Sequence, residues 1–435
     1  MSCSSVRAQP LRSLELKRQQ LPRRTNGLQR VVVFVFGAIL PLITLRVAGD
    51  GVDHWLERVT VSDVLAVVIC CLMVLGKQLQ LSRSLNCYIA CVTLSLAIGV
   101  CNAWGSDEYV DVVVEYAALV IAASFFLVGY NIACNSGLHE VLLWGVIAGV
   151  FWEGVIVAHD YMYSGAQWFP DTNERRVRGT FRACGQLGAY AFAAAAICFT
   201  GSAIQFCRKW LSRWLLSAGG LSLFIIVAAS RRSAIFSVLG AVALHFVLAF
   251  RFGISRSQVV LLMGIVGIAA GFYLNRNTLQ DSFLASRMTH KIEELGTGES
   301  WTELEFESAM HHVFEWFPLG LGMGRGKNVS HDGWHELHNG NLSLIVELGL
   351  PGFLVFYAIL GFPLWRSARA LVSGRAQVYN LVLFCTLIGA VAFMIHNRLH
   401  RDRTFMLFLG LATAQVTTCS AARASASKSV LQTTT

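Results

Sequence analysis

The stretch VVVFVFGAILPLITL, residues 31–45, decides the fold class. Its apolar residues follow one another without the short alternating pattern that strands of a transmembrane barrel show. Backbone groups in lipid must form their hydrogen bonds within the segment, so a block of this kind is expected to be a helix. The basic, poorly apolar residues 1–30 precede it without a small-residue cleavage site. We therefore expect a retained membrane helix rather than a signal peptide.

Apolar blocks of the same kind recur along the chain. Its 435 residues are 55% hydrophobic and 14% charged, with a mean hydropathy of +0.55, whereas soluble domains carry about 25% charged residues. This composition indicates an integral membrane protein. Blocks of about 20 apolar residues predict about twelve transmembrane helices, near 31–48, 61–76, 86–104, 110–130, 138–158, 183–206, 212–229, 233–250, 257–274, 340–365, 378–396 and 404–421.

The predicted organisation is all-α and polytopic. A basic tail (1–30) precedes helices one to nine (31–274), and a large loop (275–338) separates these from helices ten to twelve (339–421). A Ser/Thr-rich tail (422–435) follows. Because basic residues in short loops favour the cytoplasmic side, both tails are expected inside and the large loop outside.

Three loops on the predicted outer face are rich in arginine against this orientation rule. They are NERRVRGTFRACG (173–185), ASRRSA (229–234) and HNRLHRDR (396–403). One interpretation is that single charges reach lipid headgroups. The other is an anion site, because planar guanidinium groups suit phosphate. The candidate substrate-binding arginines are Arg178, Arg182, Arg231 and Arg232.

The large loop contains WTELEFESAMHHVFEWFPLGLGMGRG, residues 301–326. Its apolar spacing predicts an amphipathic helix that either rests on the membrane interface or packs against the bundle. The adjacent His311 and His312 would point in different directions on a helix, so we expect no shared metal there. The residues of the apolar stripe are Trp301, Phe306, Met310, Phe314 and Phe317.

Other chemistry is not indicated. The twelve cysteines form no paired CxxC motifs, and no GxxxxGK[ST] phosphate loop is present. We therefore expect neither a metal nor a cofactor. The formal net charge of +9 suits anionic lipid as well as anionic substrates, so nucleic acid is not an expected partner.

The large loop ends in HELHNGNLSLIVELGLPG, residues 335–352, where a polar segment runs into an apolar helix. His338 is either a catalytic or acceptor-positioning residue, because histidine titrates in a useful range, or a cap of the helix. Asn339 beside it is a candidate substrate-binding residue, and His335 is expected to be a spectator. A glutamate within a membrane helix is costly, so Glu347 is expected to pair with an arginine of the bundle.

Taken in order, these motifs resemble those of the O-antigen ligase and O-antigen polymerase superfamily of bacterial inner-membrane glycosyltransferases. The motifs are RGTF (178–181), SRRSA (230–234), PLGLGMG (318–324), HN (338–339) and ELGLPG (347–352). The resemblance covers about residues 170–365. It implies a GT-C-like fold with a large periplasmic loop between helices nine and ten.

The resemblance further implies that undecaprenyl diphosphate carries the sugar donor and that the active site faces the periplasm. A ligase transfers the chain to lipid A–core; a polymerase transfers it to another lipid-linked repeat unit. Arg178, Arg231 or Arg232, and His338 match the family positions. The family often has an asparagine where this chain has Gln186.

The loop arginine of the family corresponds either to Arg287 or to Arg325. We expect a ligase-like, metal-independent transferase, with a polymerase of surface polysaccharide as the alternative. A non-catalytic polysaccharide transporter or flippase is a second alternative. It predicts charges along a central path, and most of the expected helices lack them.

Overall fold

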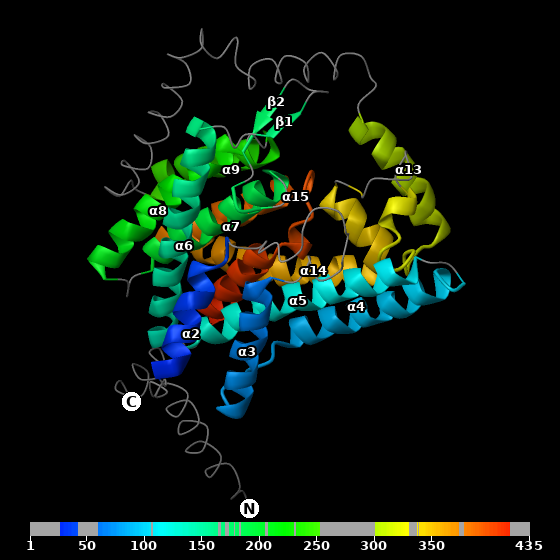
Figure 1. Cartoon of the computed structure of the whole chain (residues 1–435), viewed down its shortest axis with the longest axis horizontal. Coiled ribbons are helices and arrows are strands. Elements are labelled where there is room, and N and C mark those ends of the chain that lie inside the picture. The colour runs from blue at the N-terminus through cyan, green and yellow to red at the C-terminus, as the bar shows by residue number, and fades with distance from the viewer. Residues whose placement is uncertain are drawn as a thin grey trace, which may run out of the picture.

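The described residues are almost all helical (Figure 1). The computed structural model describes residues 27–41, 60–105, 108–163, 167–169, 174–177, 179–181, 184–204, 208–229, 232–252, 301–329, 337, 339–373 and 378–417. The predicted helical class is confirmed. One small departure is a hairpin in which β1 (Gln167–Phe169) pairs antiparallel with β2 (Glu174–Arg176), Trp168 opposite Arg175. The sequence analysis did not anticipate it.

The helices lie where the apolar blocks predict them. The bundle consists of α2 (Gly27–Ala38), α3 (Val61–Leu75), α4 (Arg83–Asn102), α5 (Tyr109–Ala133), α6 (Ser136–Tyr163), α7 (Cys184–Ser202), α8 (Lys209–Ala228), α9 (Arg232–Phe252), α14 (Gly340–Val372), α15 (Val378–Met394) and a helix over 403–417. The expected helix at 257–274 lies outside the described residues. Expected and observed ends differ most in α2, which stops at Ala38, and in α14, which continues to Val372.

Among the described residues, five helices are long and apolar enough to cross a membrane, namely α4, α5, α6, α8 and α14. Four further apolar helices, α2, α3, α9 and α15, are shorter. This set of helices fits a multi-pass membrane protein, because a helix satisfies most of its backbone hydrogen bonds within the segment.

Small residues let the helices approach closely. Where α2 crosses α6, a Cβ built on Gly145 would lie 3.0 Å from the Cα of Gly37. Gly129 on α5 lies similarly against the backbone of Leu407 in the 403–417 helix. Close backbone approach at small residues is the usual way in which membrane helices pack, since lipid supplies no hydrophobic drive between them.

Long-range polar contacts group the helix ends into two sets. In one set, Arg325 pairs with Glu108, and Arg403 pairs with Asp63. In the other, the Asn131 side chain forms hydrogen bonds with the backbone of Gln80, and the side chains of Gln415 and His139 form a hydrogen bond. The distribution of basic residues predicts that the first set lies outside and the second inside.

Candidate functional site

The start of α14 is defined by a capping side chain. The Asn339 Oδ1 accepts hydrogen bonds from the backbone N–H groups of Asn341 (2.9 Å) and Leu342 (3.3 Å). This arrangement satisfies donors that have no partner within the helix. Asn339 therefore caps the helix, and His338 precedes the cap directly.

Most of the predicted site residues lie outside the described part of the chain. This holds for His338, His335, Arg178, Arg182, Arg231 and Arg287. Arg232 is described as the first residue of α9, without its side chain. The structure therefore shows the described neighbours of these residues.

Two of the predicted motifs meet through the loop that follows α15. The Asn397 Nδ2 donates to the Ser233 Oγ at 2.8 Å, beside Arg232 at the start of α9. The carbonyl oxygen of the same Asn397 lies against Gly340, where no Cβ would fit. The starts of α9 and α14 are therefore neighbours, although more than a hundred residues separate them in sequence.

The RGTF segment is held by a buried carboxylate. The Glu153 side chain, fully buried in α6, accepts hydrogen bonds from the Thr180 N–H (3.0 Å) and hydroxyl (2.7 Å). Gly179 has φ +56° and lies so close to this carboxylate that a Cβ would overlap it. Glycine is needed at such a position for both reasons. Glu153 thereby fixes the chain directly after Arg178. The sequence analysis missed this role, although a glutamate inside an apolar span was the available signal.

The PLGLGMG segment inserts between α4, α5 and α14. Gly320, Gly322 and Gly324 have φ values of +77°, +89° and +73°, and each lies against the backbone of a neighbouring helix. The N–H of Leu321 donates to Val346 O at 2.7 Å, and Met323 is fully buried. These glycines permit close packing of backbone on backbone.

The PLGLGMG segment contacts α14 where this helix is interrupted. Gly349 has φ +67° and ψ −175°, which interrupts the helix two residues before Pro351. The Leu350 N–H bonds to Pro318 O at 2.8 Å, and the Ser95 hydroxyl donates to Glu347 O at 2.6 Å. Backbone groups released by the break therefore find partners in the neighbouring chain, as burial in a membrane bundle requires.

A buried charge cluster lies beside this break. The Arg401 guanidinium contacts the Glu115 carboxylate at 2.5 Å and also bonds the Glu347 carboxylate. The exposed fractions of these side chains are 12%, 12% and 4%. Burial lowers the pKa of Arg401, but the two carboxylates outweigh it and raise that pKa above the ordinary value. The predicted pairing of Glu347 with an arginine is confirmed.

This cluster changes the interpretation of the loop HNRLHRDR. Arg401 pairs with Glu115 and Glu347, and Arg403 pairs with Asp63 at 2.8 Å. Both guanidinium groups are thus already used by protein carboxylates, so the predicted anion site does not extend to them. The sequence signal for the partners of these arginines was again a carboxylate within an apolar span.

Arg325, one of two candidates for the loop arginine, pairs with Glu108. Its side chain is 17% exposed, and burial lowers its pKa from the ordinary value. The pair joins the end of the PLGLGMG insertion to the residue that precedes α5.

The helix α13 (Trp301–Glu315) carries the apolar stripe. Phe306, Phe314 and Phe317 are 48%, 74% and 61% exposed. These aromatic side chains thus expose apolar surface, as a helix at a membrane interface would. Met310 instead joins a small core with α14.

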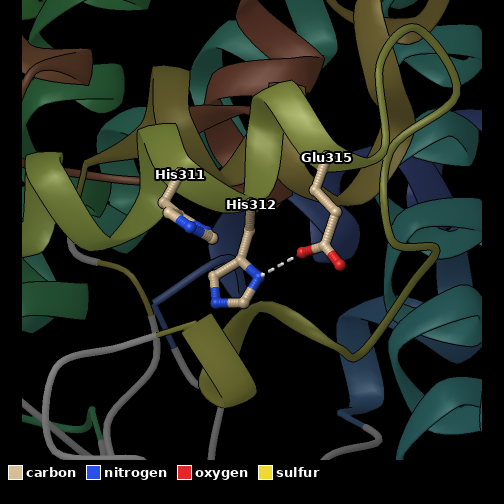
Figure 2. A group of neighbouring side chains, drawn as sticks. All are labelled: His311, His312 and Glu315. Carbon is tan, nitrogen blue, oxygen red and sulfur yellow. Dashed lines mark ion pairs between the residues drawn. The ribbon is translucent and has the colours of Figure 1, made fainter.

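The geometry of His311 and His312 differs from the prediction. Their ring centroids lie 5.5 Å apart, and each residue offers a nitrogen near the Glu315 carboxylate (Figure 2). The prediction of divergent directions considered the pair alone. Glu315 lies three and four residues further on, where helix geometry places it between them.

No protein-family model matches the chain, and no curated protein matches it in sequence. The resemblance to the O-antigen ligase and polymerase superfamily therefore rests on the sequence motifs alone.

Proposed function

We propose that this chain transfers a polysaccharide from undecaprenyl diphosphate to a hydroxyl of lipid A–core at the periplasmic face, in the manner of an O-antigen ligase. The observation that carries the proposal is the contact of Asn397 with Ser233 and Gly340. It makes neighbours of two segments, one containing the arginines 231 and 232 and the other His338. A reaction that needs cations and a proton acceptor at one place requires such an arrangement.

In the proposed reaction, the acceptor hydroxyl oxygen attacks the anomeric carbon of the donor. A new C–O bond forms, the bond from that carbon to the diphosphate oxygen breaks, and the diphosphate leaves with the electron pair. Negative charge grows on the leaving group, so fixed guanidinium groups lower the barrier. Arg178, Arg182, Arg231 and Arg232 are assigned this role.

His338 is assigned the role of general base, which takes the proton of the attacking hydroxyl. Histidine fits, because its pKa lies near the working pH and general-base help is typically worth about 10²–10⁴-fold in rate. In the sequence it directly precedes Asn339, which caps the start of α14. Helix starts favour anions, which suits a site that holds a diphosphate.

Two buried carboxylates support the proposed site without touching substrate. Glu153 bonds Thr180 and lies against Gly179, which follow Arg178 in the sequence. Glu347, paired with Arg401, holds the segment of α14 that follows His338. Rigid support of this kind matters, because small displacements of catalytic groups cost rate.

The test combines a gene deletion with point variants in the natural host. Deletion should leave bare lipid A–core and accumulated lipid-linked polymer, seen on a lipopolysaccharide gel. Core bearing a single repeat unit would indicate the polymerase instead. Donor trapped on the cytoplasmic side would indicate a transporter.

Point variants then test the assigned residues in protein that reaches the membrane at a normal level. His338→Ala and Arg178→Ala should abolish transfer. Arg178→Lys should rescue poorly, because an ammonium group lacks the paired geometry of a guanidinium. Arg208→Ala is the matched control, since Arg208 is an 80% exposed arginine on the opposite set of helix ends. Full transfer by either His338→Ala or Arg178→Ala would refute that residue's assignment, and chelator should leave transfer unchanged.

A further inference from the structure

The helix α13 has one face fixed against the protein. Ala309 is fully buried, and Val313 packs with it against Leu342 and Val346 of α14. The Ser308 hydroxyl also donates to Val329 O at 2.6 Å. Because α13 is held by these contacts, the side chains along it have a defined direction.

Three potential metal ligands follow Ser308 along the same side of α13. The His312 Nδ1 lies 3.3 Å from the Glu315 Oε2, and one ligand atom from each of His311, His312 and Glu315 lies within 4.8 Å of the others. Figure 2 shows both rings and the carboxylate on the same side of the helix. Spacings of three and four residues place Glu315 between the two rings.

These distances can be compared with those of a metal site. Zinc bound by histidine nitrogen and carboxylate oxygen at about 2.0–2.1 Å in a tetrahedron has ligand atoms about 3.4 Å apart. The His312–Glu315 separation of 3.3 Å already has this value. Even at the 4.8 Å limit, a third ligand would need to close by about 1.4 Å to reach tetrahedral spacing. His311 is exposed, so a change of its side-chain rotamer is the movement that would close this distance.

We propose that His311, His312 and Glu315 bind a divalent transition metal ion of the zinc class. Two imidazoles with one carboxylate are donors that suit zinc and its neighbours rather than calcium or magnesium, which prefer oxygen. Three protein ligands leave at least one coordination position for water. The ion would be bound on the last turn of α13, a few residues before the PLGLGMG segment. The proposal is independent of the proposed transferase reaction.

The test measures zinc binding to the purified full-length protein in detergent. We expect isothermal titration with ZnCl₂ to show one saturable site per chain. His312→Ala and Glu315→Gln should each weaken it at least tenfold, because even partners beyond the ligands are worth about 10–100-fold in affinity. Zinc should also raise the melting temperature of the natural protein but not of the variants, since a ligand of the folded state stabilises it.

His159→Ala is the matched control. His159 forms a pair with Asp160 at 3.7 Å, and the described residues offer it no third donor of the cluster kind. This variant should bind zinc like the natural protein. Absence of saturable zinc binding in the natural protein would overturn the proposal and leave a simple His312–Glu315 ion pair. Binding that survives both His312→Ala and Glu315→Gln would overturn it equally, because the ion would then sit elsewhere.

Discussion

Arg401→Ala should destabilise the protein more than any exposed arginine substitution. The change leaves the carboxylates of Glu115 and Glu347 facing each other, 12% and 4% exposed, without their shared cation. Removing one partner of a buried ion pair typically costs about 3–5 kcal/mol. Arg401 serves two carboxylates, so we expect the upper part of that range.

The control is Arg208→Ala. Arg208 pairs with Glu140 at 3.8 Å, with side chains 80% and 40% exposed. Exposed pairs are worth about 0–1 kcal/mol. The structure therefore predicts a difference of several kcal/mol between two arginine-to-alanine changes in one protein.

Thermal unfolding in detergent, followed by the loss of the monodisperse peak on size exclusion, measures this difference. A triple variant, Arg401→Met with Glu115→Gln and Glu347→Gln, should recover much of the loss, because neutral residues need no cation. Equal melting temperatures for Arg401→Ala and Arg208→Ala would refute the reasoning. Failure of the triple variant to exceed Arg401→Ala would place the cost in packing rather than in the unpaired carboxylates.

Three further predictions follow from the packing, a buried histidine and the topology. Gly320→Ala should destabilise the protein by about 1–3 kcal/mol, because alanine is strained at φ +77°. The new Cβ would also lie 2.7 Å from Val346 O, which adds to this cost. Gly361→Ala is the control: its Cβ would have nothing within 4 Å, so the change should be neutral or stabilising in the same melting assay. Burial and the nearby Arg401 and Arg398 guanidinium groups lower the pKa of His400 well below 6.5. As the pH drops below 6.5, this imidazole stays neutral in the folded protein but takes up a proton in the unfolded chain. The stability of the fold therefore falls below pH 6.5. His400→Phe should weaken this acid sensitivity between melts at pH 7.5 and pH 5.5; an unchanged difference would contradict it. Reporter fusions after Gly326 and residue 171 should be outside and those after residues 256 and 375 inside, and a cytoplasmic Gly326 would remove the shared outer face on which the proposed site depends.

The helix positions could be predicted because membrane helices obey a simple rule. A run of apolar residues must be a helix in lipid, and its length is fixed by the bilayer. The start of α3 was predicted at 61 and that of α14 at 340, where Thr60 and Asn339 provide the caps. The 33-residue length of α14 was not predicted, because its polar end, with Arg366 and Arg369, extends beyond the apolar block.

The candidate site was predictable in part. The charge of Glu347 required a cation, and Arg401 supplies it. Which arginine this would be depended on the contact between α14 and the loop after α15, and no local pattern records a tertiary contact. An arginine that pairs within the protein and one that binds a substrate anion look alike in a sequence. The sequence therefore did not separate Arg401 and Arg403, which pair with protein carboxylates, from candidates for an anion site.

The glycines of PLGLGMG affect how the resemblance to known transferases is tested. Their positive φ angles and backbone contacts give them a structural reason to be glycine. A variant there should lose activity through misfolding, and its loss would say nothing about chemistry. His338 and the arginines 178, 231 and 232 carry the chemical assignment. If a variant of one of these residues melts like the natural protein but loses transfer, the residue acts on substrate. If variants of these residues retain transfer, the proposed transferase mechanism is wrong, although the fold is unaffected.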